Sequence, residues 1–460
     1  MEESAFQSQF TKTSGSMPLT SAAESDNSVS GPRVAALAVI MCFCLMAMAV
    51  MVLALIITTS DILGGGSTVA RTDADIDSGP LANPRPSAAK HPTPATPEQT
   101  SSTPPTVKEI ICTVSESAGS ESVYPPDKYC DYLFYTDVFV VSSAISGLRD
   151  HISWHVFRQR ARTYKIMKLG ISFDFEDLLP EKLDHAAGAL SALRNEGIKH
   201  YGLLRALVHR SDFSYMAART KPLLEKFKQI QGGDQTAKTV IAIGCDDYTG
   251  DVLSNFTATL MEVANTYTVD IVIAISSVAS LLYKPCNAFP PTVLTSTNPR
   301  YEGLLKHWHI VSPRANYTRP SIQTGLSFDL STLEYNLVGT ASSLNESLFS
   351  PCHGAWRDSR NLLCANGDFR SKADNYFGDQ VSAYGVLTHS SKVVLMSEYN
   401  DSVAFKFTTG VNKQGLRQRT AWLLYNVHLQ DFSSKCPEPP YTVIRLFCLA
   451  LKGQDDQRCQ

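Results

Sequence analysis

The feature that most constrains this chain is an uninterrupted apolar run near its N-terminus. Residues 34–57 read VAALAVIMCFCLMAMAVMVLALII, 24 consecutive positions without a charged side chain. At a rise of about 1.5 Å per residue, a helix of this length crosses a hydrocarbon core of about 30 Å. A secretory signal has a shorter apolar core and a small-residue cleavage site, and a polar leader precedes this run. The sequence therefore predicts an uncleaved signal-anchor helix over residues 34–58, with a cleaved signal as the alternative.

The orientation of this helix follows from residues on its C-terminal side. Charges flanking the run give only a weak positive-inside signal. Nine of the eleven cysteines follow the run, as expected for an oxidising compartment. All N-x-[ST] glycosylation acceptors also follow it, namely Asn255, Asn316, Asn345 and Asn400. We expect a type II single-pass membrane glycoprotein whose C-terminal part is extracellular or lumenal, at the plasma membrane rather than in the Golgi.

The segments on either side of the membrane helix have compositions typical of disorder. Residues 1–33 form a polar leader, and residues 59–108 are rich in Pro, Ser, Thr, Ala and Gly. Such segments bury too little apolar surface to offset chain entropy, so we expect a disordered cytoplasmic tail and a flexible stalk. A Golgi glycosyltransferase would carry a D-x-D motif at a strand end. The match at Asp73-Ala74-Asp75 lies in the predicted stalk, which argues against that class.

Residues 109–460 have the composition and patterning of a folded α/β domain. Short apolar runs alternate with helix-period stretches, and strands that are apolar on both faces indicate a parallel sheet covered by helices. Eight runs suit a (β/α)8 barrel (TIM barrel), and a doubly wound open sheet is the competing fold. The predicted strands are 109–115, 130–141, 164–173, 199–208, 238–244, 269–276, 321–330 and 420–429. The predicted helices are 178–197, 214–231 and 251–267.

Several classes of function are disfavoured by what the sequence lacks. The net charge is −3 and no basic run occurs, so nucleic acid is not an expected partner. No G-x-G-x-x-G follows the first strand, no G-x-S-x-G elbow is present, and no C-x-x-C pair has partner histidines. We therefore predict no cofactor and no metal site, and we assign His307 and His309, in KHWH, to a surface loop.

Four segments in collinear order resemble glycoside hydrolase family 18, the chitinases and chitinase-like proteins. They are the spacing from Cys112 to the CDYLFYTD opened by Cys130, the segment KHYGLLRALVHRSDFSYMAARTKPLLEKFKQI, VDIVIAISSVASL, and EYNDSVAFKFTTGVNKQGLRQRTAWLLYNVHLQDF. The resemblance is to divergent, arthropod-type members and implies a (β/α)8 barrel from about residue 110 to residue 451. It also implies a disulfide between the cysteines on the first two strands, Cys112 and Cys130.

The departures from the family pattern concern its catalytic residues. The resemblance implies a D-x-x-D-x-D-x-E motif on the fourth strand, whose glutamate protonates the glycosidic oxygen. Residues 200–208 read HYGLLRALV and contain no carboxylate. The sixth-strand tyrosine and aspartate of the family fall on residues such as Ser276 and Ser277. We therefore expect a pseudoenzyme, with no assigned catalytic residue.

Other acidic residues at strand ends are the candidates for a relocated active site. They are Asp174, Glu176 and Asp177 after the third run and Asp246 and Asp247 after the fifth, since barrel enzymes place chemistry at these ends. Each cluster directly precedes a predicted helix, and helix capping is the favoured interpretation. As sugar-contacting aromatic residues we name Trp422 and Tyr425, near where the family keeps a pocket-floor tryptophan, with ordinary core packing as the alternative.

The remaining cysteines allow several pairings. Cys352 and Cys364 bracket HGAWRDSRNLL and are expected to close a loop between the last two strands. Cys459 is the candidate for an odd thiol or an intermolecular bridge, and the partners of Cys245, Cys286, Cys436 and Cys448 stay open.

The predicted function is binding at the cell surface by a degenerate chitinase-like barrel on a stalk. The ligand is either a chitin-like or other N-acetylated glycan or a protein. The alternatives are an active glycoside hydrolase with relocated carboxylates and a structural surface protein without a ligand.

Overall fold

The part of the chain that can be described begins at Lys108. The computed structural model describes residues 108–147, 151–208, 212–277, 285–296, 298, 300–313, 316–341, 344–365, 369–371, 383–387, 390–408, 420–433, 435–436, 438–453 and 456–460. The predicted tail and membrane helix, and the stalk up to residue 107, lie outside these ranges. Within the ranges, no helix combines the length and the hydropathy that a bilayer-spanning segment needs.

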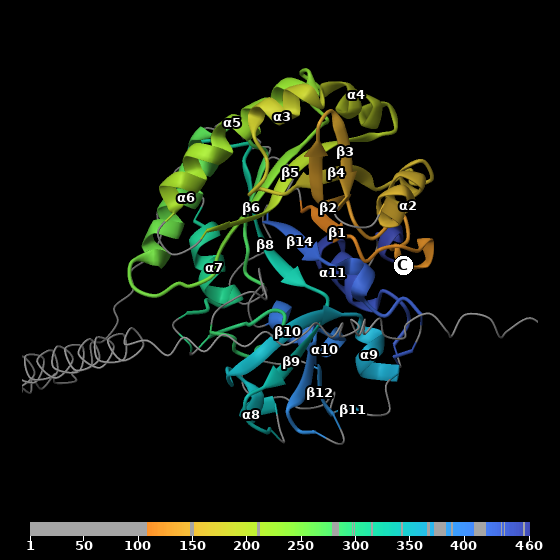
Figure 1. Ribbon diagram of the computed structural model, residues 1–460, viewed down its shortest axis with the longest axis vertical. Helices are drawn as coiled ribbons and strands as arrows, with labels where there is room; N and C mark the ends of the chain where they lie inside the picture. Colours follow the sequence, from red (N-terminus) through yellow and green to blue (C-terminus); the bar gives the residue numbers. More distant parts are fainter. Residues whose placement is uncertain are drawn as a thin grey trace, which may run out of the picture. The chain divides into compact units, whose positions relative to one another are not determined.

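Eight parallel strands close into a barrel (Figure 1). Neighbouring strands follow the order β1-β14-β8-β7-β6-β5-β4-β2, and β1 pairs with β2 to complete the circle. This closure excludes the open sheet and confirms the predicted (β/α)8 barrel. Every predicted strand is present within a few residues of its predicted bounds. The strands are β1 (Ile110–Val114), β2 (Tyr132–Val141), β4 (Lys168–Phe173), β5 (Ile198–Val208), β6 (Thr239–Cys245), β7 (Ile271–Ala274), β8 (Gln323–Asp329) and β14 (Thr420–Tyr425).

Alternation along each strand explains why the barrel strands are apolar on both faces. On β14, Ala421 and Leu423 belong to the cluster that fills the barrel interior, whereas Trp422 and Leu424 belong to the cluster between the barrel and its helices. Successive side chains of a strand point to opposite faces, so both faces are buried when helices surround the sheet. A polar side chain that faces inward near a strand end therefore either lines the site at the barrel mouth or forms hydrogen bonds with neighbouring residues.

Helices pack on the outside of the barrel. The predicted helix 178–197 is interrupted at Ala186, and the other two predicted helices are present as α5 and α6. The sequence did not predict α2, α7 or α11. The helices are α2 (His151–Ala161), α3 (Pro180–His185), α4 (Ala187–Asn195), α5 (Phe213–Gln231), α6 (Val252–Thr266), α7 (Leu304–Val311), α8 (Leu344–Ser347), α9 (Arg360–Ala365), α10 (Asn400–Lys406) and α11 (Thr442–Lys452), with short 3₁₀ turns η1 (Glu121–Val123), η4 (Val427–Leu429) and η5 (Gln457–Cys459).

The expected surface loop at His307 is wrong. His307 lies in α7 and is 1% exposed. Its Nε2 is 3.0 Å from the Tyr248 hydroxyl and its Nδ1 is 3.0 Å from the Gly303 carbonyl. Burial lowers the pKa of His307 to about 4. The neutral imidazole is thus part of the packing between α6 and α7.

A second, antiparallel sheet is inserted between β8 and β14. Its strand order is β10-β9-β13-β12-β11, and it has its own small core around Leu333, Tyr335 and Met396. The sequence analysis did not predict this sheet. Its strands are β9 (Thr332–Leu337), β10 (Cys352–Asp358), β11 (Phe369–Ser371), β12 (Ala383–Leu387) and β13 (Val393–Ser397), and a further strand, β3 (Ala144–Gly147), pairs antiparallel with the end of β2.

Four disulfides are present in the described residues. Cys112–Cys130 joins β1 to the start of β2, as the family resemblance implied. The expected Cys352–Cys364 pairing is wrong: the bonds are Cys286–Cys352 and Cys364–Cys436. Cys352 begins β10 and Cys364 follows it in α9. A strand of seven residues spans about 23 Å, whereas bonded cysteines need Cα atoms within about 7 Å.

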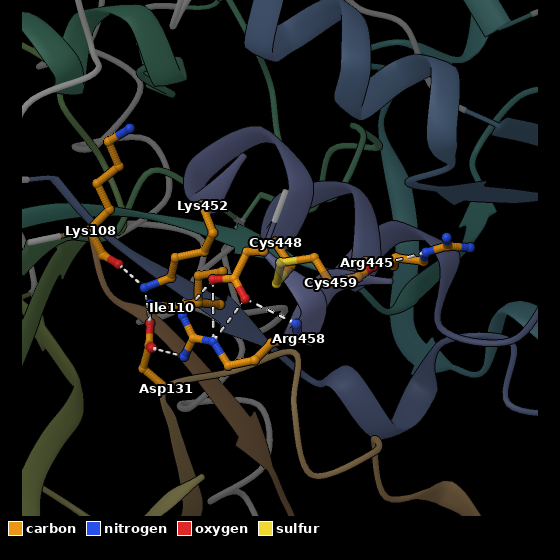
Figure 2. Close-up of a disulfide and its surroundings, with 9 residues drawn as sticks. Lys108, Ile110, Asp131, Arg445, Cys448, Lys452, Arg458 and Cys459 are labelled. Carbon is orange, nitrogen blue, oxygen red and sulfur yellow. Dashed lines mark hydrogen bonds and ion pairs between the residues drawn. A yellow bond between two sulfur atoms is a disulfide. The ribbon is translucent and has the colours of Figure 1, made fainter. Parts of the chain in front are cut away.

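The C-terminal segment is fastened to the start of the barrel (Figure 2). Cys459 is not the odd thiol, because it bonds Cys448 in α11; the free cysteine among residues 108–460 that the structure describes is the buried Cys245. Asp131, which opens β2, lies 2.8 Å from Lys452 Nζ and 3.3 Å from Arg458 Nη1, and it accepts a hydrogen bond of 2.8 Å from the Ile110 amide. We call this set of contacts the C-terminal clamp.

Candidate functional site at the barrel mouth

The C-terminal ends of the barrel strands surround a cavity of about 270 Å³. Side chains from the ends of β1, β2, β5, β7, β8 and β14 line it, and Arg357 of β10 reaches it from the inserted sheet. We call this space the mouth cavity. Its lining residues are Ser115, Glu116, Ser117, Thr136, Asp137, Arg205, Ile275, Asp329, Arg357, Tyr425, Asn426 and Leu429.

A bulge in β2 directs Asp137 into the mouth cavity. The register of β2 against β4 shifts between Tyr135 and Val138, and Asp137 has a φ of 61°. A non-glycine residue in this left-handed region costs about 1–3 kcal/mol, so the surrounding contacts must hold it there. Bulges of this kind are frequent beside functional sites because they re-aim a side chain.

Arg205 of β5 is the partner of Asp137. Its Nη1 lies 3.2 Å and 3.4 Å from the two carboxylate oxygens of Asp137. Burial acts to lower the pKa of Arg205, but the combined effect of Asp137, Tyr425 and Asp329 outweighs it and the pKa is raised. The β5 side chain that lines the mouth cavity is therefore a cation, and no carboxylate of this strand lines it.

Asp329, at the end of β8, joins three elements. This fully buried carboxylate accepts hydrogen bonds from the Ser331 amide at 3.0 Å and hydroxyl at 2.7 Å, from Asn426 Nδ2 at 3.0 Å and from Arg357 Nε at 3.0 Å. Its charge is fully compensated by these donors. Asp329 thus ties β8 to the end of β14 and to the inserted sheet, with three of the four bonds on Oδ1 and that of Arg357 on Oδ2.

The two predicted aromatic residues lie on opposite sides of the barrel wall. Tyr425 lines the mouth cavity, donates its hydroxyl proton to the Leu204 carbonyl, and has its pKa raised well above the ordinary range by burial. Trp422 does not reach the cavity. It packs outside the barrel with its ring centroid 5.1 Å from that of Phe407 and 5.7 Å from that of Phe328. Trp422 and Tyr425 are three positions apart on β14, an odd number, so alternation places Trp422 on the opposite face, in the outer core.

The five acidic candidates lie away from the mouth cavity. None of Asp174, Glu176, Asp177, Asp246 and Asp247 lines it. Asp174 lines a separate hollow beside the end of β2, and burial raises its pKa. Glu176 is exposed, Asp246 lies in the β6–α6 loop, and Asp247 Oδ2 is 3.9 Å from Arg300 Nε.

The expected capping role is also wrong in its details. The helices that follow are α3 and α6, whose N-caps are Leu179 and Asp251, and neither makes a side-chain cap bond. Asp174 Oδ1 instead accepts from the Glu176 amide, and Asp247 Oδ1 from the Thr249 amide, at 2.8 Å and 2.9 Å. These contacts to the residue two positions on are Asx turns within the loops.

The serines predicted on the sixth strand brace two strands. Ser276 Oγ donates to the Ser327 carbonyl at 2.9 Å, and the Ser277 and Ser327 hydroxyl oxygens are 2.8 Å apart. This link joins the end of β7 to β8 beside the mouth cavity. Within the described ranges, no three His, Cys, Asp or Glu side chains gather in an arrangement that holds a metal ion.

The sequence analysis missed the carboxylates that the mouth cavity contains, Glu116, Asp137 and Asp329. A signal for two of them was present. Asp137 is the last residue of CDYLFYTD and lies at the bulge of β2, and Asp329 is the last residue of β8, the strand end at which barrels place their chemistry. A single acid inside an apolar run is a weaker sequence signal than the acidic clusters behind the third and fifth strands.

Comparison with known proteins rests on structure. No protein-family model and no curated protein sequence matches the chain. Human YKL-39, described as a pseudo-chitinase with retained chitooligosaccharide binding properties, is similar with a TM-score of 0.55 and 12% identity, over 75% of this chain and 100% of that one. An immunomodulatory active chitinase of Trichuris suis has a TM-score of 0.52 at 12% identity, over 75% and 100% of the two chains.

An insect enzyme gives the same result. Catalytic domain 2 of the Ostrinia furnacalis Group II chitinase has a TM-score of 0.51 at 11% identity, over 76% of this chain and 97% of that one. These similarities extend over nearly the whole length of the three other proteins and over about three quarters of this chain, and they agree with the resemblance drawn from the sequence. The folded part of this chain is therefore a divergent barrel of the type found in the chitinases and chitinase-like proteins of glycoside hydrolase family 18.

Proposed function

We propose that this chain is a membrane-anchored, catalytically inactive chitinase-like protein that binds an N-acetylated glycan in its mouth cavity. The observation that carries the proposal is that Arg205 lines the cavity from β5, the fourth barrel strand, on which the family resemblance expects the general acid and on which no carboxylate is present. A guanidinium does not protonate a glycosidic oxygen, because it stays charged and holds its protons at any physiological pH. It does donate hydrogen bonds to sugar hydroxyl and acetamido oxygens.

The size and polarity of the mouth cavity support a sugar ligand. Its volume of about 270 Å³ lies near the lower limit of ordinary small-molecule sites, which span roughly 300–1,000 Å³. That space suits one sugar unit, with the rest of a chain extending outward. Serine hydroxyls, carboxylates and a guanidinium on the lining offer both donors and acceptors. Human YKL-39, with the same fold, is described as retaining chitooligosaccharide binding as a pseudo-chitinase.

A glycoside hydrolase with relocated acids is the second candidate. Asp137 and Asp329 lie in the mouth cavity, which a relocated active site requires, although each is paired with an arginine. Retaining and inverting glycosidases need one carboxyl group able to give up a proton to the leaving group. Each carboxylate is engaged by an arginine rather than facing the cavity alone, so this arrangement favours binding over hydrolysis.

Titration calorimetry of the full chain in detergent micelles, with the N-acetylglucosamine tetramer as ligand, tests this proposal. We expect saturable binding that falls at least tenfold in Arg205→Ala and is unchanged in Arg162→Ala, whose side chain is 67% exposed outside the cavity. The same preparation should release no fluorophore from a chitobioside or chitotrioside substrate. Hydrolysis that Asp137→Asn or Asp329→Asn abolishes would favour the relocated enzyme, and absence of any glycan binding would favour a protein partner or no ligand.

The proposal includes the predicted membrane topology, with the barrel extracellular or lumenal. Two acceptor asparagines are well placed for glycosylation, because Asn255 on α6 and Asn316 are exposed. Asn400 is less suitable, since Ser402 of its sequon is fully buried and donates to Glu398 Oε2 at 2.8 Å. Removal of N-glycans should shift the mass of the wild-type chain, and by less in the Asn255→Gln/Asn316→Gln double variant. Surface biotinylation then separates the plasma membrane from the Golgi.

A further inference from the structure

Within the described residues, one carboxylate of the mouth cavity has no ion-pair partner. Asp137 pairs with Arg205 and Asp329 pairs with Arg357, which leaves Glu116 as the third carboxylate of the lining. Glu116 Oε2 is buried and has no hydrogen-bond partner. A buried carboxylate oxygen without a donor is costly, and such a group calls for a specific explanation.

The backbone around Glu116 is held in place. Ser117 Oγ lies 2.7 Å from His428 Nε2, and Ser115 Oγ lies 3.2 Å from the same atom. His428 is 1% exposed, and burial lowers its pKa to about 4, so the imidazole is neutral at physiological pH. Because both neighbours of Glu116 are anchored to one buried side chain, the segment from which Glu116 lines the mouth cavity is held in place.

Arg205 supplies a second ligand-directed group in the same cavity. Its contacts to Asp137 use Nη1 alone, so Nε and Nη2 keep donors for a ligand. The cavity thus offers one unpaired anion beside a guanidinium with spare N–H groups. A ligand that fits both carries a cation and, next to it, oxygen acceptors.

From this arrangement we infer that the mouth cavity selects an amino sugar with a free ammonium group, as in a deacetylated N-acetylglucosamine unit. This inference rests on the proposed glycan-binding function and names the sugar that occupies the pocket. The ammonium donates charge-assisted hydrogen bonds to Glu116, which are stronger than those of a neutral donor. The ring hydroxyls accept from Arg205. An acetylated nitrogen carries no charge and leaves the carboxylate of Glu116 uncompensated.

The test compares two tetramers on the full chain in detergent micelles at pH 6, where an amine with a pKa of about 8 is protonated. We expect the glucosamine tetramer to bind at least tenfold more tightly than the N-acetylglucosamine tetramer. Glu116→Gln, which keeps the shape and removes the charge, should reduce this preference to less than threefold. The matched control is Glu176→Gln, an exposed glutamate outside the cavity, which should keep the full preference.

The outcomes separate this inference from the function on which it rests. If wild type binds both tetramers equally, or the acetylated one more tightly, the selectivity is absent while glycan binding stands. If it binds neither, the proposed function fails and the inference fails with it. A preference that survives in Glu116→Gln refutes the role of this carboxylate. Tryptophan fluorescence shows whether the variant is folded. If it is not, the comparison of the two tetramers on the wild-type protein still decides the inference.

Discussion

Asp329 offers the most direct test of how the mouth cavity is held together. Removing its carboxylate with Asp329→Ala breaks the four hydrogen bonds it accepts, including the ion pair with Arg357. Both partners are well buried, with side chains 1% and 18% exposed. Breaking a buried ion pair by deleting one partner costs about 3–5 kcal/mol, and we take about 3 kcal/mol because Arg357 retains some solvent contact.

The expected change in melting temperature follows from the size of the domain. With an unfolding entropy of about 2.1 cal/mol/K per residue, roughly 350 residues give about 0.7 kcal/mol/K. A loss of about 3 kcal/mol then lowers the melting temperature by about 4 °C. All four tryptophans, Trp154, Trp308, Trp356 and Trp422, belong to the barrel and its helices or to the inserted sheet. Their fluorescence in the full chain therefore reports the melting of this part alone.

A control on the neighbouring strand isolates the effect of the buried carboxylate. Asp358 is an exposed residue at the end of β10, and Asp358→Asn should change stability by no more than about 0.5 kcal/mol. A melting temperature of Asp329→Ala within about 1 °C of this control would refute the assignment of Asp329 as the joint between barrel and inserted sheet.

Four further predictions address other parts of the fold. Cys459→Ser opens the loop closed by the Cys448–Cys459 disulfide, whose sequence separation is 11, and should cost about 3 kcal/mol, measured by the same melting assay. Gly170→Ala should destabilise by about 1–3 kcal/mol, because a Cβ there meets Phe134 at 2.5 Å and the His200 carbonyl at 2.8 Å, whereas Gly188→Ala in α4 meets nothing within 4 Å and should stabilise. Burial lowers the pKa values of His200, His307 and His428 to about 3, 4 and 4, so these side chains stay neutral in the folded protein while the unfolded chain protonates near pH 6.5. The free energy of unfolding should therefore fall by about 1.4 kcal/mol per pH unit for each histidine as the pH drops from 6.5 toward 4. A melting temperature that does not change over that pH range would contradict this. Alkylation without reduction should leave Cys245 unmodified in the native protein, since burial raises its thiol pKa to about 11, and mass spectrometry after unfolding should find it modified while Cys448 and Cys459 stay linked.

The barrel was predictable from the sequence because its strands are buried on both faces. Runs such as KTVIAIG and VDIVIAIS need no knowledge of tertiary partners to be recognised, and the structure places them at β6 and β7. The inserted sheet was not predictable in the same way. Its strands have one covered face and mixed composition, as in β10, where exposed Trp356 alternates with half-buried neighbours.

The site was only partly predictable, since its key contacts join distant parts of the chain. Tyr425 was identified from its place near the final strand. The pairing of Asp137 with Arg205 depends on a bulge in β2 that changes which residues face inward, and no local pattern marks such a bulge. The pairing of Asp329 with Arg357 depends on the inserted sheet folding back over the mouth cavity. Disulfide partners were obscured for the same reason, because Cys352 bonds a cysteine 66 residues away.

The central claim, a barrel that binds a glycan without cutting it, is tested most directly by one titration. The full chain is mixed with the N-acetylglucosamine and glucosamine tetramers, heat of binding is recorded, and the recovered sugars are weighed by mass spectrometry. We predict saturable binding that Arg205→Ala weakens at least tenfold, with every tetramer recovered intact. Recovery of dimers or trimers, or binding that is indifferent to Arg205, would contradict the claim.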